Sequence, residues 1–177
     1  TEARVIYVGS FSKILFPSLR IGYMVVPHDL IDAFVAARAL IDRGSPSMEQ
    51  AVLADFIAEG HFVRYIRRVR SLYAARQEAL VEAAGQELQG LLGVAAKDSG
   101  MHLVGWLPDG VDDQLAYRRA AVYEVEAPPL STYYMEQPGR GGLLLGYTGV
   151  NEDEIREGVA RLATALCDLR SNASASE

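Results

Sequence analysis

The sequence predicts an α/β protein, and three observations support this fold class. Two short apolar runs, Val5 to Val8 and Arg20 to Val26, are rich in β-branched and aromatic residues and are bounded by Gly and Pro, which is typical of buried strands. Longer stretches repeat apolar residues every three or four positions, as one face of a helix requires. Half of the 177 residues are hydrophobic and 23% are charged, so the chain is long enough to bury a core.

The same patterns assign elements along the rest of the chain. After the two strands, apolar spacing predicts helices over 29–41 and 46–59 and a long amphipathic helix over 61–88. The rest of the chain alternates short strands with helices. The patterns predict strands within 94–107, a helix over 114–121, and strands over 122–125 and 143–148. Asn151 begins the terminal helix, because Glu154 follows three residues later. The Ser/Ala tail, 171–177, is expected to be disordered.

The turn between the first two strands carries an unusual concentration of polar side chains. Of the 17 basic residues, only Lys13 and Lys97 are lysines, so a chain that otherwise uses arginine has a lysine at the end of a core strand. An amine, unlike a guanidinium, can lose its proton and attack a carbonyl. Nearby hydroxyls and Arg20 could gather on a phosphate, because serine donates single hydrogen bonds and arginine a bidentate pair. An imine-forming amine beside a phosphate site indicates pyridoxal phosphate.

This turn has two alternative interpretations. A Ser-x-Ser-Lys sequence after a strand is often only a solvated turn, but the flanking strands, Arg20 and the scarcity of lysine favour a functional site. A nucleotide-binding P-loop is excluded, because no Gly-x-x-x-x-Gly-Lys-Ser/Thr sequence surrounds Lys13.

These residues resemble a known motif. Gly9-Ser10-Phe11-Ser12-Lys13, followed by Pro17, Leu19-Arg20 and Gly22-Tyr23, is similar to the Schiff-base lysine motif of fold-type I pyridoxal-phosphate enzymes, the class I/II aminotransferase superfamily. Later segments resemble the aminotransferase-like C-terminal domain of MocR-type (GntR family) transcriptional regulators, namely Gln50 to Gly60, Arg67 to Tyr73, Gly100 to Leu103 and Gly142 to Tyr147. The resemblance runs from about Arg4 to about Leu169.

The resemblance implies a particular organisation. The chain would be the C-terminal part of a fold-type I pyridoxal-phosphate-dependent transferase, comprising the end of the large, mainly parallel-sheet domain, a long connecting helix and a small α+β domain. The implied boundaries are 1–60, 61–88 and 89–170, with 171–177 as tail. Residues that contact the cofactor ring in the family come from sequence before the lysine strand, so this chain alone would bind pyridoxal 5'-phosphate poorly.

The resemblance also assigns roles to individual residues. Lys13 would hold pyridoxal 5'-phosphate as a Schiff base and transfer protons, while Ser10, Arg20 and Ser12 would bind its phosphate. Ser45 and Ser47 are possible phosphate contacts across a homodimer, or ordinary helix caps. Aminotransferases of this fold usually bind the substrate carboxylate with an Arg on the strand corresponding to 143–147, which has none here. Arg140 is the nearest replacement, and an exposed loop charge is an equal alternative.

Composition restricts the other functions. The net charge of −6 argues against nucleic-acid binding by this chain, although one basic cluster is present, consisting of Arg64, Arg67, Arg68, Arg70 and Arg76. The single cysteine excludes an internal disulfide and fits a cytoplasmic protein. No signal peptide or long apolar run suggests secretion or a membrane partner. His28 and His102 lack metal-ligand spacing, so no metal is expected.

Three hypotheses follow. The first is the pyridoxal-phosphate-binding, effector-sensing domain of a MocR-type regulator, which responds to an amino acid or amine and contacts DNA only through an N-terminal domain that this sequence lacks. The second is a class I/II aminotransferase that moves amino groups between amino acids and 2-oxo acids. The third is a cofactor-free dimerisation module. A helix-turn-helix segment upstream of Thr1 would favour the regulator.

Overall fold

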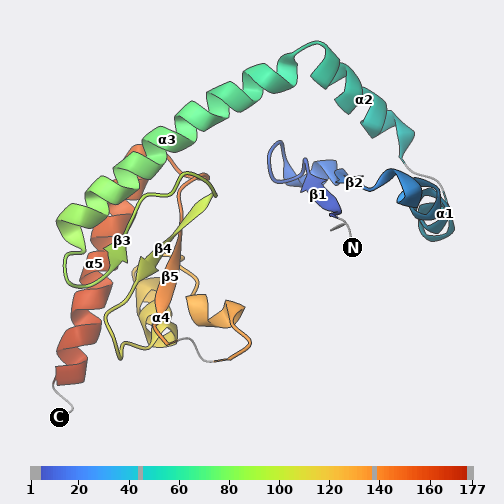
Figure 1. The fold of residues 1–177 in the computed structure, drawn as a ribbon. Coiled ribbons are helices and arrows are strands. Elements are labelled where there is room, and N and C mark those ends of the chain that lie inside the picture. Colours follow the sequence, from blue (N-terminus) through green and yellow to red (C-terminus); the bar gives the residue numbers. More distant parts are fainter. Residues whose placement is uncertain (1–4, 44–45, 137–138, 175–177) are drawn as a thin grey trace. The chain divides into compact units, whose positions relative to one another are not determined.

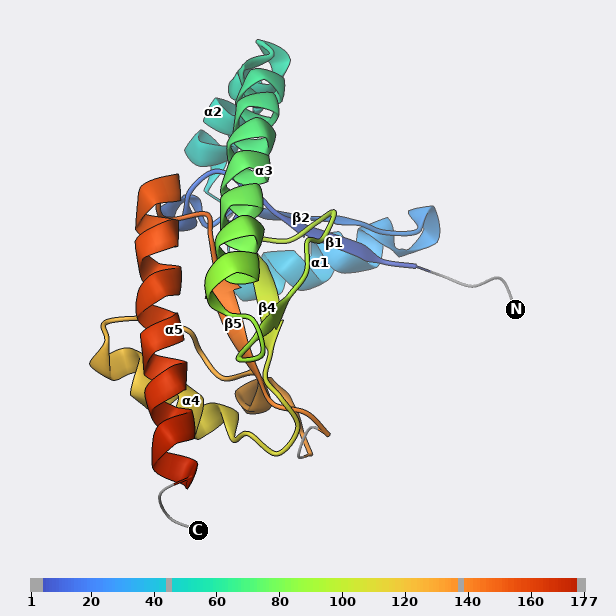
Figure 2. The same cartoon turned by 90° about the vertical axis from the view of Figure 1, so that its left-hand side faces the viewer.

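The computed structural model describes residues 5–43, 46–136 and 139–174, and these form two compact α/β units, Thr1–Arg68 and Val69–Glu177 (Figure 1). The first contains β1 (Tyr7–Ser10), β2 (Gly22–Val25), α1 (Ile31–Asp42) and α2 (Ser47–Ala58), with two short 3-10 helices, Pro17–Leu19 and His28–Leu30. The helix α3 (His61–Glu87) begins in this unit and continues without interruption into the second (Figure 2). The second unit then adds β3 (Gly93–Val94), β4 (His102–Trp106), α4 (Asp113–Val122), the 3-10 helix Leu130–Tyr133, β5 (Gly142–Gly146) and α5 (Glu152–Ser174).

The first two strands form an antiparallel ribbon, but they are not buried as the sequence predicts. β1 begins two residues later than the run Val5 to Val8, and β2 is shorter than the run Arg20 to Val26. Val8 is 69% exposed and Val25 is 60% exposed. The physical reason is that the described residues supply no third strand beside the ribbon, whereas apolar runs of this kind are typical of strands with neighbours on both edges and both faces.

The first unit as a whole has little interior. Among its described residues only Leu53 is buried, and several apolar side chains of its helices are more than 60% exposed, including Val35, Leu40, Ile41 and Met48. The helices α1 and α2 occupy the predicted stretches. Ser45 lies outside the described residues, and Ser47 is the first residue of α2.

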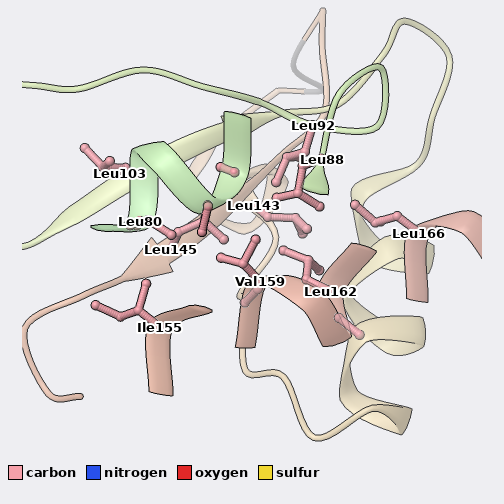
Figure 3. Close-up of a cluster of buried hydrophobic side chains, with 14 of the residues drawn as sticks. Leu80, Leu88, Leu92, Leu103, Leu143, Leu145, Ile155, Val159, Leu162 and Leu166 are labelled. Atoms are coloured by element: carbon pink, nitrogen blue, oxygen red, sulfur yellow. The ribbon is translucent and has the colours of Figure 1, made fainter. Parts of the chain in front are cut away.

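The second unit has a continuous hydrophobic core. Its antiparallel sheet has the order β3-β4-β5, and Leu103 pairs with Leu145 across β4 and β5. Side chains from all three helices and the sheet meet in one cluster (Figure 3), which includes Leu80, Leu88, Leu103, Ala116, Leu143, Val159 and Leu162. Burying each large aliphatic side chain contributes about 1.5–3 kcal/mol, so this unit has a clear source of stability.

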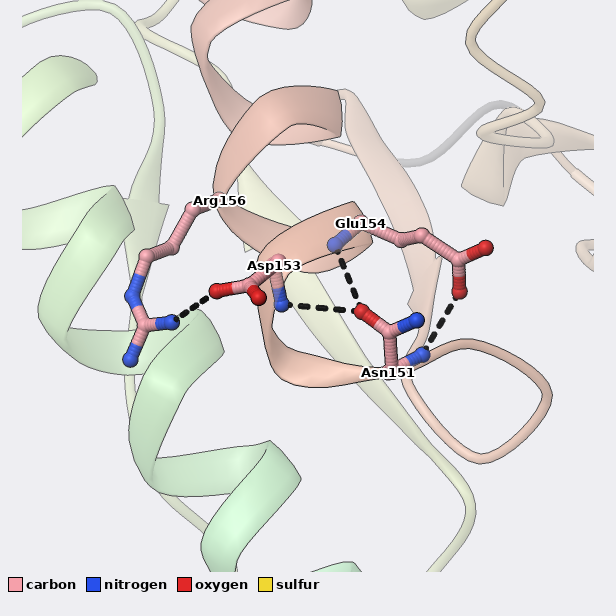
Figure 4. A network of polar contacts seen from close by, with 4 residues as sticks. All are labelled: Asn151, Asp153, Glu154 and Arg156. Atoms are coloured by element: carbon pink, nitrogen blue, oxygen red, sulfur yellow. Dashed lines mark hydrogen bonds and ion pairs between the residues drawn. The ribbon is translucent and has the colours of Figure 1, made fainter.

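The start of α5 confirms the predicted capping box (Figure 4). The Asn151 side chain accepts hydrogen bonds from the backbone N–H groups of Asp153 and Glu154, both at 3.0 Å. The Glu154 carboxylate in turn accepts a hydrogen bond from the Asn151 N–H at 2.7 Å. The N–H groups of the first helical turn and the N–H of the cap residue itself, which have no partner within the helix, are thus both hydrogen-bonded.

Two sequence expectations are wrong in this unit. Residues 122–125 do not form a strand, because Glu124 adopts φ 58° and Val125 donates back to the Ala120 carbonyl at 3.1 Å, which closes the end of α4. The tail 171–177 is not wholly disordered, because α5 continues to Ser174. The Ser171 hydroxyl donates to the Cys167 carbonyl at 3.0 Å within that extension. Residues 175–177 lie outside the described part of the chain.

A polar contact joins α4 to α5. Asp168 accepts hydrogen bonds from the Tyr123 hydroxyl and from Arg119, whose Nη2 lies 2.5 Å from the carboxylate. These bonds, first that of Tyr123 and then that of Arg119, lower the pKa of Asp168 below its usual value. The hydrogen bond to Asp168 conversely raises the pKa of Tyr123.

This contact predicts a pH dependence of stability. Because the pKa of Asp168 is lower in the folded chain, its stabilising contribution is complete above the unfolded pKa of about 3.9 and is lost as the pH falls towards the folded value. We expect Asp168→Asn to flatten this part of the acid unfolding curve, followed through the single tryptophan, Trp106. The control Asp109→Asn, at a side chain that is 96% exposed, should keep the original curve. Equal curves for all three proteins would contradict the prediction.

No described helix is both long enough and apolar enough to cross a membrane.

Candidate functional site

The predicted lysine turn lies at one end of the β1–β2 ribbon. Ser10, the last residue of β1, pairs with Gly22, the first residue of β2. The Phe11 N–H then donates to the Ile21 carbonyl at 2.9 Å, which extends the ladder by one step. Ser12 and Arg20 are the next residues on the two sides. The antiparallel register therefore brings Ser10, Ser12 and Arg20 to the same end of the ribbon.

Lys13 is presented by a tight turn. The N–H groups of Ile14 and Leu15 both donate to the Phe11 carbonyl, at 3.1 and 2.8 Å, so residues 11–15 form one isolated helical turn. Lys13 and Ser10 are exposed, and Ser12 is half-buried. Among the described residues, the structure gives the Lys13 amine no hydrogen bond or ion pair. The amine is thus accessible for reaction with a carbonyl.

Arg20 has an unusual backbone. It ends the 3-10 helix Pro17–Leu19 with φ 49° and ψ 30°, in the left-handed region. That conformation costs a residue with a side chain about 1–2 kcal/mol, and glycine is the usual choice there. Arg43 ends α1 with the same kind of backbone, at φ 51°, so this conformation serves both residues as a helix end.

Close packing explains the glycine of the motif. A Cβ on Gly9 would lie 2.3 Å from the Tyr23 ring, so any larger residue would displace that ring. Tyr23 also packs against Phe11, with ring centroids 5.3 Å apart, and Phe11 packs edge-on against Phe62 at 5.8 Å. A hydrogen bond with the Tyr7 side chain raises the pKa of Tyr23. Phe11, at the start of the lysine turn, is thus packed between Tyr23 of β2 and Phe62 of α3.

The segment after Lys13 packs on the helices of the same unit. It borders an apolar groove of about 250 Å³, which is lined by Leu15, Phe16, Leu19, Val52, Leu53, Phe56 and Tyr65. The Tyr65 hydroxyl donates to the Leu15 carbonyl at 3.5 Å. The loop that links Lys13 to Arg20 is therefore anchored on α2 and the start of α3.

Arg140 belongs to the second unit, in the segment before β5. Its Nε donates to the Leu107 carbonyl at 2.7 Å, and its guanidinium lies 3.9 Å from the Asp109 carboxylate and 5.9 Å from the centre of the Trp106 ring. These contacts hold the side chain against the end of β4. Both polar contacts use Nε, so the two terminal nitrogens of the Arg140 guanidinium could bind a further carboxylate.

A buried carboxylate next to this segment was missed by sequence reasoning. Asp113 is only 4% exposed and accepts hydrogen bonds from the Ser131 hydroxyl at 2.6 Å, the Ser131 N–H at 2.9 Å and the Gly142 N–H at 3.2 Å. Its neighbour Asp112 is the N-cap of α4. The sequence Asp112-Asp113 could have indicated this second role. A helix start needs only one capping aspartate, so the other is free to bind elsewhere. Asp113 fixes the start of β5 to the 3-10 helix Leu130–Tyr133.

Among the described residues, no three His, Cys, Asp or Glu side chains gather closely enough to hold a metal ion together.

Comparison with known proteins places these features in context. No family model matches the chain. The "Probable rhizopine catabolism regulatory protein MocR" of Rhizobium meliloti is 39% identical over 171 residues, which cover 97% of this chain and 35% of that protein. The "Uncharacterized HTH-type transcriptional regulator YhdI" of Bacillus subtilis is 37% identical, with 97% and 36% covered.

Solved structures show the same fold. The α-aminoadipate aminotransferase LysN of Thermus thermophilus, complexed with N-(5'-phosphopyridoxyl)-L-leucine, matches with a TM-score of 0.84 and 30% identity, over 94% of this chain and 43% of that one. The kynurenine aminotransferase of Pyrococcus horikoshii matches with a TM-score of 0.85 and 32% identity, over 95% and 42%. The chain thus spans about a third to two fifths of the length of the proteins it matches.

Proposed function

Because this chain belongs to the fold-type I superfamily of aminotransferase-like proteins, we propose that it is the cofactor-binding part of a MocR-type (GntR family) transcriptional regulator. The observation that carries this proposal is the lysine turn at the end of the β1–β2 ribbon, in a chain that matches a regulatory protein over 97% of its length. The identity to that regulator, 39%, exceeds the 31% to the 2-aminoadipate transaminase of Thermus thermophilus.

The residues at the ribbon end fit pyridoxal 5'-phosphate. Lys13 offers an exposed amine without a competing partner among the described residues, and the register brings two serine hydroxyls and a guanidinium to the same end. Ser10 and Ser12 would each donate one hydrogen bond to the phosphate, and Arg20 would bind it through two parallel N–H groups.

The roles of the side chains follow from their chemistry. Pyridoxal 5'-phosphate, when bound, supplies an electron sink for bonds at the carbon that carries the amine of an effector. Lys13 would hold the group covalently through Nζ, release it to the incoming amine and then carry a proton to or from that carbon. In a regulator the release of Lys13 is itself the signal, so repeated turnover is not needed.

The partners of the complete protein are part of the same proposal. An amine or amino acid would be the effector, a second copy would complete a homodimer, and DNA would be bound through a helix-turn-helix segment that precedes this chain in the cytoplasmic protein. Two of the similar proteins carry names that fit, one a regulatory protein and one an HTH-type regulator. Arg140 is the proposed contact for an effector carboxylate, through its terminal nitrogens.

An aminotransferase is the second candidate. The solved structures that match the chain are aminotransferases, and this supports an enzyme that moves amino groups between amino acids and 2-oxo acids. The absence of an arginine from Gly142–Gly146 favours the regulator, because β5 then has no cation for a substrate carboxylate.

The complete reading frame distinguishes the two candidates. We expect the purified full-length protein to bind DNA from its own promoter region, and we expect amines that react with the cofactor to change this affinity. Fluorescence anisotropy with labelled promoter DNA measures the first, and release of 2-oxo acid measures transamination in the same samples. Sustained turnover without DNA binding would contradict the regulator and support the enzyme.

A further inference from the structure

The lysine turn, residues 11–15, is held at both of its ends by the start of α3. At its first residue, the Phe11 ring packs edge-on against the Phe62 ring, with centroids 5.8 Å apart and planes inclined at 72°. At its last residue, the Leu15 carbonyl accepts a hydrogen bond from the Tyr65 hydroxyl at 3.5 Å. Phe62 and Tyr65 are three residues apart on α3, and residues at that spacing lie on the same side of a helix. One side of α3 therefore contacts both ends of the turn.

These contacts lie within the first unit, Thr1–Arg68, and they are supported from β2. The Phe11 N–H donates to the Ile21 carbonyl at 2.9 Å, and the Phe11 ring also packs against Tyr23 with centroids 5.3 Å apart. The far end of the turn has its own packing, because Leu15 and Tyr65 line the same apolar groove. The turn therefore cannot rotate about the ribbon without losing a contact with β2 or with α3.

The helical form of the turn sets the direction of Lys13. The Phe11 carbonyl accepts from the N–H groups of both Ile14 and Leu15, so successive side chains are about 100° apart, as in a helix. Leu15 thus returns to the side of Phe11, which faces α3. Lys13 projects about 200° around the turn from Phe11, on the side away from α3. A turn that lost its contacts with α3 could unwind, and its amine would then point in several directions.

We propose that Phe62 and, to a smaller extent, Tyr65 are positioning residues for Lys13. This inference rests on the proposed function, in which the Lys13 amine reacts with pyridoxal 5'-phosphate. Lys13 Nζ adds to the aldehyde carbon, and the aldehyde oxygen leaves as water with the two protons of the neutral amine. Phe62 and Tyr65 act on this step only through the turn. The step needs one orientation of the amine, so covalent binding weakens in proportion to the fraction of molecules that have it.

Two forms of the cofactor separate positioning from general support. Pyridoxine 5'-phosphate carries an alcohol in place of the aldehyde, so it presents the same ring and phosphate but cannot form the bond to Lys13. In the complete protein we expect Phe62→Ala to weaken pyridoxal 5'-phosphate binding about tenfold and to leave pyridoxine 5'-phosphate binding unchanged. Titration of the absorbance band of the lysine-bound cofactor measures the first affinity, and calorimetry measures the second.

Matched variants show whether the ring contact is responsible. Phe62→Leu keeps an apolar side chain against Phe11 and should recover most of the affinity. Val63→Ala truncates the next residue of α3, which projects about 100° around the helix from Phe62, and should change neither affinity. Tyr65→Phe removes only the long hydrogen bond and should weaken covalent binding about twofold. Phe62→Ala should have no further effect in a Phe11→Ala background, because the partner ring is already absent.

Amide hydrogen exchange tests the same contact without the cofactor. The N–H groups of Ile14 and Leu15 close the lysine turn, so Phe62→Ala should speed their exchange in the cofactor-free complete protein, while Val63→Ala should not. Equal weakening of the two cofactor forms, an unchanged affinity for pyridoxal 5'-phosphate or unchanged exchange in Phe62→Ala would each overturn the positioning role. Absence of lysine-bound cofactor from the unaltered protein would instead contradict the proposed function, and this inference with it.

Discussion

Replacing Lys13 with alanine in the complete protein should abolish covalent capture of pyridoxal 5'-phosphate. The expected result is loss of the visible absorbance band of the lysine-bound cofactor and loss of borohydride-fixed cofactor. The reason is that only an amine forms the carbon–nitrogen double bond, and Lys13 is the amine at the ribbon end. Absorbance spectra and borohydride trapping measure both effects.

The chain offers a matched control for this experiment. Lys97 is its only other lysine, and its backbone N–H donates to the Gln77 side chain at 3.1 Å in the second unit. Lys97→Ala should retain both the absorbance band and the fixed cofactor. A Lys13→Ala protein that still fixes the cofactor would contradict the assignment, and so would a loss in the Lys97→Ala protein alone.

Removing the buried carboxylate of Asp113 should produce the largest loss of stability by a polar substitution in the second unit. In Asp113→Ala the hydroxyl and N–H of Ser131 and the N–H of Gly142 lose their acceptor. A fully buried donor left without a partner costs about 1–3 kcal/mol, and because the Gly142 N–H is buried while the two Ser131 donors are partly buried, we expect a total loss of about 3 kcal/mol. For a unit of this size the unfolding midpoint should fall by more than about 10 °C.

The neighbouring aspartate provides the comparison. Asp112 is an exposed N-cap whose carboxylate accepts from the Gln114 and Leu115 N–H groups. Asp112→Ala should cost only about 1 kcal/mol, as is usual for a cap. Thermal unfolding followed by Trp106 fluorescence measures both variants. Equal losses would show that Asp113 acts only as part of the helix start.

The elements that were predicted correctly are those with strong local signals. The helix α3 was predictable from the uninterrupted apolar spacing over 61–88, and the start of α5 from Asn151 and Glu154. The antiparallel return of β2 to β1 brings Ser10 and Arg20 to one end of the ribbon, and their binding of a phosphate stays a prediction. Local sequence carries this information because caps, turns and periodicity involve neighbouring residues.

The features that were missed depend on packing or on backbone strain. The exposure of β1 and β2 follows from what lies beside the ribbon, which their own residues do not encode. Residues 122–125 have strand-like composition, but backbone bonds to Ala120 and Ala121 continue the end of α4 instead. The left-handed backbone of Arg20 has no local signal, because arginine rarely adopts it.

The superfamily and the fold are established by the comparisons, and the assignment of the cofactor to one amine is the central proposal. The most direct test is borohydride reduction of the complete protein in the presence of pyridoxal 5'-phosphate, followed by peptide mass spectrometry. The account predicts a pyridoxyl group on Lys13 and an unmodified Lys97. A modification on Lys97, or on neither lysine, would contradict it.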